Sequence, residues 1–379
     1  MISKDQLGIY VHIPFCLQKC NYCDFCSFPR AGEERIAQYV DALLAQASSW
    51  SGHCADCEVD TVYFGGGTPT MLTLPQWERL LGTLRRHFRI REDAEITAET
   101  NPAAVDRDYL RALRGMGVNR LSMGVQSADD GELRSLGRVH DFAGARRTFA
   151  DARAAGFDNV SIDLMLGIPH QTRESLSRTL DAFVALSPEH ISAYLLKIEE
   201  GTPFGRMADT LPLPDDDITC EMYLDTVRTL AAAGYTQYEI SNFARAGKHS
   251  RHNLRYWLGR PYLGLGLAAH SDFGGRRFAA GRDPDAYLRG DWMEECQQIE
   301  PEERRAEYVM LRLRLAEGID VADYAARFGR DFYGDFEKVL AKYRSAGLLR
   351  EDGGSVALTP SGMLLSNSVL ADLLEEVHF

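Results

Sequence analysis

The chain has 379 residues, of which 45% are hydrophobic and 26% are charged, and its formal net charge is −13. This composition is typical of a globular protein, and the negative charge argues against a general binder of nucleic acid or anionic membranes. No uncharged apolar run of about 18 residues occurs, and the N-terminus lacks the pattern of a secretory signal, so we expect a cytoplasmic protein.

Strand-like and helix-like segments alternate along the first half of the chain. Alternating or β-branched segments predict strands, and apolar residues three or four apart predict helices. The predicted strands are 7–15, 60–66, 94–100, 119–125, 159–166 and 190–196, and the predicted helices are 33–49, 75–87, 107–116, 142–155 and 173–186. Six successive strand–helix units predict an α/β fold with a parallel sheet closed, or partly closed, as a barrel.

The rest of the chain predicts a smaller second unit. We expect a barrel with its extension over residues 1–283, a polar and irregular linker over 284–303, and a C-terminal module over 304–379. Within that module, three helical patterns precede a hairpin whose turn is Asp352-Gly353-Gly354, an order that resembles a winged helix. Its many acidic residues favour a lid or packing module over a DNA-binding one.

Four of the eight cysteines, Cys16, Cys20, Cys23 and Cys26, fall within eleven residues of the segment "YVHIPFCLQKCNYCDFCSF". A disulfide framework is improbable in a reducing compartment. Structural zinc remains an alternative, although zinc ligands usually come as two separated pairs. An iron–sulfur cluster is the stronger hypothesis, because short cysteine spacings let one loop wrap a cubane.

The spacing C-x3-C-x2-C directly after a strand resembles the radical S-adenosylmethionine (SAM) superfamily. That resemblance implies a partial (β/α)6 barrel and a [4Fe–4S] cluster on Cys16, Cys20 and Cys23, with SAM chelating the remaining iron. Cys26 could ligate that iron instead, but we expect it to lie off the cluster. We interpret Cys54 and Cys57 as incidental thiols, with metal capture together with His53 as the alternative.

Polar or glycine-rich motifs stand at the ends of the predicted strands, where barrel chemistry gathers. The glycines of "GGGTPT" permit close backbone approach, so we expect exposed N–H groups there. The motifs "FGGGTPT", "SMGVQS" and "SIDLMLGIPHQT" resemble the branch that contains oxygen-independent coproporphyrinogen III oxidase. This resemblance implies that SAM contacts Tyr10, Gly66, Gly67, Thr68, Glu99, Gln126, Arg138 and Asp163.

Residues 238–271 are similar to the family of haem chaperones called HemW, whose HNxxYW motif is here His252-Asn253-Leu254-Arg255-Tyr256-Trp257. The resemblance implies haem contact by His252, Tyr256 and Trp257, since a neutral imidazole is a good axial ligand. For His252 alone, a surface or hydrogen-bonded side chain is the alternative. Nearby basic residues could meet haem propionates or form a solvated face: Arg245, Lys248, Arg251 and Arg255.

The resemblance therefore implies a haem chaperone that binds haem as cargo and delivers it to recipient haem proteins such as respiratory enzymes. Two features argue against the oxidase: the first strand begins near residue 7, without the oxidase's N-terminal extension, and C-x-C is replaced by Cys23-Asp-Phe-Cys26. We expect an electron donor for the cluster and neither a nucleic-acid partner nor a membrane segment. The alternative is a radical SAM enzyme acting on a porphyrinogen, or a related methyl or methylene transferase.

Overall fold

The structure is a computed structural model that describes residues 6–377. The first five residues of the expected barrel domain and the last two of the expected C-terminal module lie outside this part.

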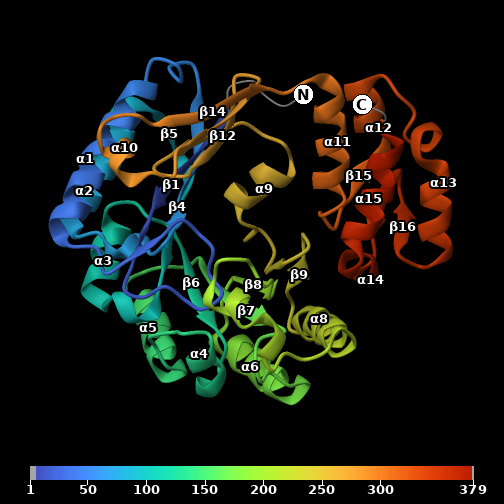
Figure 1. The fold of residues 1–379 in the computed structure, drawn as a ribbon, viewed down its shortest axis with the longest axis horizontal. Helices are drawn as coiled ribbons and strands as arrows, with labels where there is room; N and C mark the ends of the chain where they lie inside the picture. The colour runs from blue at the N-terminus through green and yellow to red at the C-terminus, as the bar shows by residue number, and fades with distance from the viewer. Residues whose placement is uncertain (1–5, 378–379) are drawn as a thin grey trace.

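Six parallel strands form the centre of the protein (Figure 1), and each overlaps a predicted strand, although β5 begins five residues before its predicted start. In the first of them, Leu7, Ile9, Val11 and Ile13 are buried toward the surrounding helices. The alternate positions of the strand therefore face the inside of the barrel. The strands are β1 (Gln6–Ile13), β4 (Glu58–Gly66), β5 (Arg89–Thr100), β6 (Arg120–Gln126), β7 (Val160–Leu166) and β8 (His190–Leu195).

The barrel is open, as the resemblance to the radical SAM superfamily implies. The described strands form one twelve-stranded sheet in the order β14-β13-β12-β11-β1-β4-β5-β6-β7-β8-β10-β9, whose two ends do not pair with each other. β11 runs parallel to β1, whereas β10 is antiparallel to β8. The added strands are β9 (Thr236–Gln237), β10 (Asn242–Ala244), β11 (Tyr262–Leu265), β12 (His270–Phe273), β13 (Arg276–Ala280) and β14 (Met293–Gln298).

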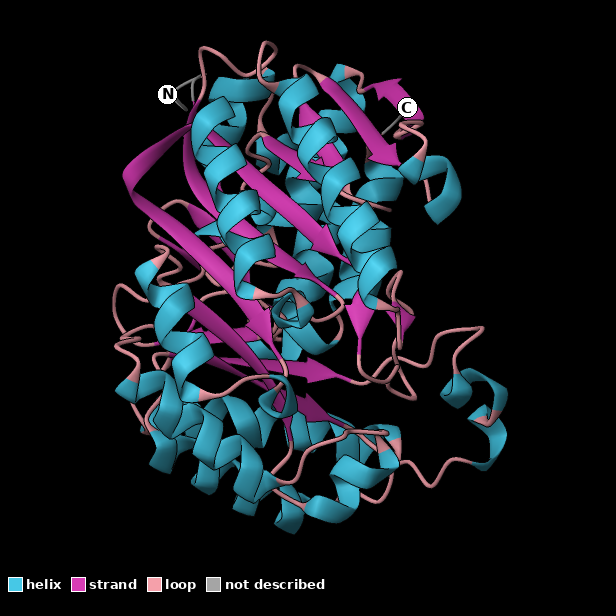
Figure 2. Ribbon diagram, turned by 90° about the vertical axis from the view of Figure 1, so that its left-hand side faces the viewer, coloured by secondary structure: helices cyan, strands magenta, loops and turns pink. Residues whose placement is uncertain are grey.

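Amphipathic helices cover the outer face of the sheet (Figure 2). Side-chain caps mark where several of them begin: Asp141 accepts a hydrogen bond from the Gly144 N–H, and Thr172 accepts one from Ser175. The helices are α1 (Glu33–Trp50), α2 (Leu74–His87), α3 (Arg107–Gly115), α4 (Asp130–Ser135), α5 (Phe142–Ala154), α6 (Arg173–Leu186), α7 (Pro203–Arg206), α8 (Asp216–Ala232) and α9 (Arg251–Trp257). Short 3-10 turns lie at Pro69–Met71, Pro102–Ala104 and Ala208–Thr210, and two short strands, β2 (Phe15–Cys16) and β3 (Phe28–Pro29), flank the cysteine loop.

The segment 284–303 is not the irregular linker that its polar composition indicates. It contains α10 (Pro284–Leu288), then β14, and it ends inside α11, which begins at Pro301. β14 pairs antiparallel with β13 through its backbone, while all six of its side chains are exposed. A strand without a buried face has no apolar alternation, so its sequence pattern could not reveal it.

The C-terminal module is winged-helix-like. Its three-stranded sheet has the order β15-β17-β16, and the β16–β17 hairpin turns at Gly353 and Gly354, where φ is 57° and 90° as the predicted Asp-Gly-Gly turn requires. Its elements are α11 (Pro301–Arg312), β15 (Ile319–Asp320), α12 (Val321–Phe328), α13 (Phe332–Ser345), β16 (Leu349–Asp352), β17 (Ser355–Leu358), α14 (Pro360–Leu364) and α15 (Ser366–Glu376).

Candidate functional site

The cysteine loop lies between β2 and β3, which pair as a short parallel bridge at the mouth of the barrel. Asn21 fixes the middle of this loop: its N–H donates to the Leu136 carbonyl at 3.0 Å and its Nδ2 donates to the Ser135 carbonyl at 2.9 Å. Gln18 Nε2 donates to the Gly137 carbonyl at 3.1 Å. The C-terminal end of α4 and the two residues after it therefore hold in place the loop that carries Cys16, Cys20 and Cys23.

Two polar side chains donate to the thiols of this loop. Thr68 Oγ1 lies 3.7 Å from Cys16 Sγ, and Arg138 Nη1 lies 3.3 Å from Cys20 Sγ. Burial raises the pKa of Cys16 and of Cys23, and the hydrogen bond from Thr68 partly opposes this effect at Cys16. Thiolates in such a place need positive charge beside them, which a metal cluster supplies. The donor set therefore fits a cluster held by three cysteines.

Neither Thr68 nor Arg138 donates to the Cys26 thiol. Its thiol interacts electrostatically with Lys19 and Arg282, and its backbone carbonyl lies 2.8 Å from His12 Nε2. Within residues 6–377, no three His, Cys, Asp or Glu side chains converge to hold one metal ion, whereas a cubane gives each thiolate its own iron. Cys54 is buried in the hydrophobic core, and burial raises its pKa to about 12.

The glycine motif packs against the cysteine loop differently from our expectation. The N–H groups of Gly66, Gly67 and Thr68 are not open to a ligand: they donate to Glu99 Oε2, the Ile13 carbonyl and the Phe15 carbonyl at 3.1, 2.9 and 2.7 Å. A Cβ on Gly67 would lie 2.7 Å from the Phe15 carbonyl oxygen, and Gly66 has φ of 106°. The glycines therefore permit close approach, as predicted, but of the chain's own backbone.

Two carboxylates, Glu99 of β5 and Asp163 of β7, project into the barrel from the strands on either side of β6. Glu99 accepts hydrogen bonds from Tyr63 Oη at 2.8 Å and from the Gly66 N–H at 3.1 Å, and Asp163 accepts one from Ser122 Oγ at 3.3 Å. Burial raises the pKa of Glu99 to about 7 and that of Asp163 to about 6. Both groups are therefore poised to change charge near neutral pH.

Gln126 and Arg138 have unsatisfied polar atoms beside these carboxylates. Gln126 ends β6 with φ of 74°, in the left-handed region that non-glycine residues seldom adopt, and its buried Oε1 has no hydrogen-bond partner. Nε of Arg138 is also buried without a partner, while its Nη2 donates to the Gly124 carbonyl. Strain and unpaired polar atoms are typical of a binding site, so the residues fit a polar ligand such as SAM.

Tyr10 completes the inner face of this site. Its ring lies 6.3 Å from that of Tyr63, and its hydroxyl lies 2.9 Å from His12 Nδ1. The structure thus brings most of the predicted SAM residues into one chain of contacts with the cysteine loop. Pattern analysis missed Tyr63 and His12, although both occupy inward-facing alternate positions on strands that it did predict.

The HNxxYW motif forms α9, which lies between the barrel and the C-terminal module in Figure 1. His252 is 1% exposed, with Nδ1 2.9 Å from Thr61 Oγ1 and Nε2 2.8 Å from Tyr256 Oη. Because both ring nitrogens have partners, neither can ligate haem iron in this conformation. The structure thus gives His252 the hydrogen-bonded role that we weighed as the alternative.

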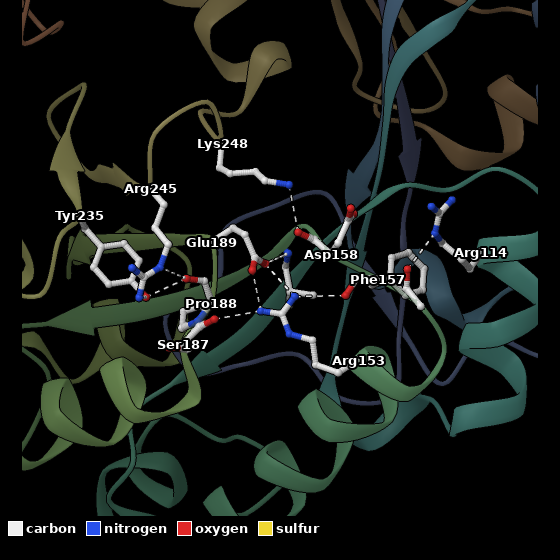
Figure 3. A network of polar contacts seen from close by, with 12 residues as sticks. Arg114, Arg153, Phe157, Asp158, Ser187, Pro188, Glu189, Tyr235, Arg245 and Lys248 are labelled. Atoms are coloured by element: carbon white, nitrogen blue, oxygen red, sulfur yellow. Dashed lines mark hydrogen bonds and ion pairs between the residues drawn. The ribbon is translucent and has the colours of Figure 1, made fainter.

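The basic residues near the motif have partners within the chain, although Arg251 is exposed. Arg245 Nε donates to the Pro188 carbonyl at 3.3 Å, and Lys248 Nζ donates to the Asp158 carbonyl at 3.1 Å (Figure 3). Arg251 Nη1 donates to the Asp93 carbonyl at 2.8 Å, and buried Arg255 forms an ion pair with Asp60.

Trp257 lies apart from the SAM residues, at the C-terminal end of α9. The guanidinium of Arg314 lies 5.7 Å from its ring, and the ring borders a cavity of about 160 Å³ together with Tyr308 and Phe328 of the C-terminal module. This side chain therefore faces the junction of the two units.

Comparison with known proteins agrees with this architecture. The family model described as Radical SAM superfamily matches residues 10–183, and the one described as HemN C-terminal domain matches residues 299–365. The structure of coproporphyrinogen III oxidase (HemN) from Escherichia coli, described as a radical SAM enzyme, superimposes with a TM-score of 0.87. It is 26% identical, over 98% of this chain and 91% of that one. Within the described residues, no helix is both long and apolar enough to cross a membrane.

Two relatives match over nearly their whole length. Heme chaperone HemW of Bacillus subtilis is 35% identical over 97% of this chain and 99% of its own, and the protein of the same name from Escherichia coli is 36% identical over 99% and 100%. The chain therefore belongs to the radical SAM superfamily and, within it, to the HemW family.

Proposed function

We propose that this protein binds haem and delivers it to recipient haem proteins in the cytoplasm, such as respiratory enzymes, and that it carries a [4Fe–4S] cluster and SAM. The full-length similarity to two proteins named heme chaperone carries the haem part of this proposal. The geometry of the cysteine loop, with Arg138 at Cys20 and Thr68 at Cys16, supports the cluster.

Cys16, Cys20 and Cys23 would hold the cluster, and the chemistry that it would supply there is one-electron reduction of SAM. Arg138 stabilises the charge on Cys20, and the free carbonyl oxygen of Gln126 accepts a hydrogen bond from the ligand. Glu99 and Asp163 are acceptors for the hydroxyl or ammonium groups of SAM when ionised. Tyr10 and Tyr63 exclude water from this side of the site.

Haem binding and transfer test the proposal directly. The anaerobically reconstituted protein is titrated with haem while the Soret band is recorded, and the loaded protein is then mixed with an apo haem protein such as a respiratory enzyme. We expect stoichiometric binding followed by appearance of the acceptor's spectrum. Absence of binding, or release no faster than from haem-loaded serum albumin, contradicts the chaperone function.

The second candidate is a porphyrinogen-oxidising radical SAM enzyme, which the TM-score of 0.87 to coproporphyrinogen III oxidase favours. Incubation of the reduced protein with SAM and coproporphyrinogen distinguishes the two. We expect no protoporphyrinogen, and its formation at catalytic yield would establish the enzyme instead.

A further inference from the structure

The side chain of His252 in the HNxxYW motif is buried and packs inside the barrel. The imidazole of His252 stacks on the ring of Tyr63, with centroids 5.2 Å apart and planes 25° apart. The hydroxyl of Tyr256 bonds to the far nitrogen of His252, and its own ring lies edge-on against Tyr262, 4.7 Å away. A layer of packed aromatic rings therefore lies against the inner side of β4.

The start of α9 is fixed to the neighbouring strand. The backbone N–H groups of Arg251 and His252 donate to the two carboxylate oxygens of Glu95, each at 3.1 Å. Ser250 caps the helix by accepting from the Asn253 N–H. A buried carboxylate that receives two N–H groups at a helix start determines the position of the helix, and hence that of the His252 ring.

One hydroxyl group of this aromatic layer, Oη of Tyr63, contacts the candidate SAM site. Tyr63 stacks on His252 with one face and donates from Oη to Glu99 Oε1 at 2.8 Å. The other carboxylate oxygen of Glu99 accepts from the Gly66 N–H. Glu99 is thus held at both oxygens, and one of its two donors depends on a ring that α9 holds in place.

We propose that His252 and Tyr63 are positioning residues for Glu99, and that the HNxxYW motif serves the SAM site from inside the barrel rather than ligating haem iron. This inference rests on the proposed function in one respect, namely that Glu99 contacts SAM. The haem cargo then binds elsewhere on the protein.

The pH at which Glu99 becomes protonated is a suitable measurement, because it would not change if Tyr63 and His252 only stabilised the fold. Burial raises the pKa of Glu99 to about 7, and the hydrogen bond from Tyr63 opposes that rise because it stabilises the charged form. Loss of the hydroxyl therefore moves the pKa further upward. The titratable or charged groups that face Glu99 from the surrounding strands and α9 are Tyr10, Tyr63, Arg120, Asp163, Tyr194 and Tyr256.

The first test uses Tyr63→Phe, which removes only the hydroxyl and keeps the stacked ring. The affinity of the reconstituted protein for SAM is measured by equilibrium dialysis from pH 6 to 9. We expect binding about tenfold weaker at pH 7.5, and a midpoint of the pH dependence raised by about one unit. Tyr324→Phe is the matched control, because Tyr324 also donates to a carboxylate, Asp335, at 2.7 Å, but in the C-terminal module. Unchanged SAM affinity and pH midpoint in Tyr63→Phe overturn the inference.

The second test separates the two roles of His252. In His252→Phe, which keeps a ring against Tyr63 but loses both hydrogen bonds, we expect weaker SAM binding with an unchanged Soret band and haem affinity. A changed Soret band with unchanged SAM affinity would restore the axial-ligand hypothesis and overturn ours. If wild-type protein binds no SAM, the proposed function fails first and the inference with it. Far-ultraviolet circular dichroism establishes that each variant is folded, and Tyr63→Phe remains informative where His252→Phe is not.

Discussion

Arg138 donates a hydrogen bond from Nη1 to Cys20 Sγ at 3.3 Å, so a charged group that borders the carboxylate site also touches a predicted cluster ligand. The same guanidinium donates to the Gly124 carbonyl, and Gly124 pairs in register with Asp163 of β7. One side chain therefore links the cysteine loop, β6 and the neighbourhood of Asp163.

Replacement of Arg138 tests this link. Hydrogen bonds and positive charge near cluster sulfurs raise the reduction potential. In Arg138→Met we expect iron and sulfide contents close to wild type, a reduction potential more negative than wild type, and SAM affinity reduced about tenfold. Redox titration followed by electron paramagnetic resonance measures the potential. Arg134→Met, at an exposed position on α4, is the control, and equal potentials in wild type and Arg138→Met would contradict the link.

The cysteines of the loop are predicted to differ in function. Single replacements Cys16→Ala, Cys20→Ala and Cys23→Ala should abolish cluster assembly, since each removes one of three thiolate ligands. Cys26→Ser should keep the cluster, because Cys26 lies outside the C-x3-C-x2-C spacing of the three expected ligands. Iron, labile sulfide and the visible spectrum are measured after anaerobic reconstitution, with Cys220→Ser as control. Loss of the cluster in Cys26→Ser would assign a fourth ligand.

Replacement of Gln126 should weaken SAM binding with little effect on stability. Gln126→Gly relieves the positive φ of 74° but removes a buried side chain, so we expect the free energy of unfolding to change by less than about 1 kcal/mol. SAM affinity should fall about tenfold, because the variant lacks the unpaired amide oxygen that would accept a hydrogen bond from SAM. Urea unfolding and equilibrium dialysis measure the two effects. Large destabilisation with intact SAM binding would make Gln126 a structural residue.

Buried histidines should make the protein sensitive to mild acid. Burial lowers the pKa of His252 to about 3 and that of His140 to about 4. Between these values and about 6.5 the unfolded chain binds protons that the folded chain does not, so stability falls as the pH falls through this window. From pH 7 to pH 5, His252 alone should cost up to about 2 kcal/mol.

The contribution of His252 is isolated by comparison with His252→Phe in urea unfolding at both pH values. Wild type should lose more stability between pH 7 and pH 5 than the variant does. Parallel losses in the two proteins would show that His252 accepts a proton in the folded state, which a buried, doubly bonded imidazole should not do.

Asp272 should hold the C-terminal module against the barrel. It lies on β12 and accepts hydrogen bonds from Arg277 at 3.0 Å and from Arg304 of α11 at 2.7 Å. Asp272→Asn leaves two guanidinium groups without a full counter-charge, so we expect destabilisation of about 2 kcal/mol. Hydrogen exchange in α11 measures the loosening. Asp285→Asn, whose partner Arg35 lies in an exposed pair, should have a much smaller effect, and equal effects would contradict the docking role.

Local periodicity predicted the barrel strands and helices well because each parallel strand has a buried apolar face and each helix an apolar stripe. The long Arg89–Thr100 strand extends beyond its predicted start because its first half, Arg89 to Asp93, is polar and largely exposed. β14 was missed for the same reason. Both errors occur where backbone pairing, without side-chain burial, forms the strand.

The sequence predicted the kind of chemistry at the candidate site but not the partners of its side chains. The cysteine spacing indicated a cluster, but the partners of each group lie far along the chain: Arg138 is 118 residues from Cys20, and His252 is 191 residues from Thr61. The burial of His252 and the closure of the glycine N–H groups therefore could not be read from local patterns. Tyr63 was missed because an aromatic residue on a strand is usually core.

The most direct test of the central claim is electron paramagnetic resonance of the reconstituted, reduced protein with and without SAM. If three thiolates hold the cluster and its remaining iron is open, a reduced [4Fe–4S] signal should be present and should change in shape when SAM is added. A protein that yields no such signal, or whose signal stays the same at saturating SAM, contradicts the account.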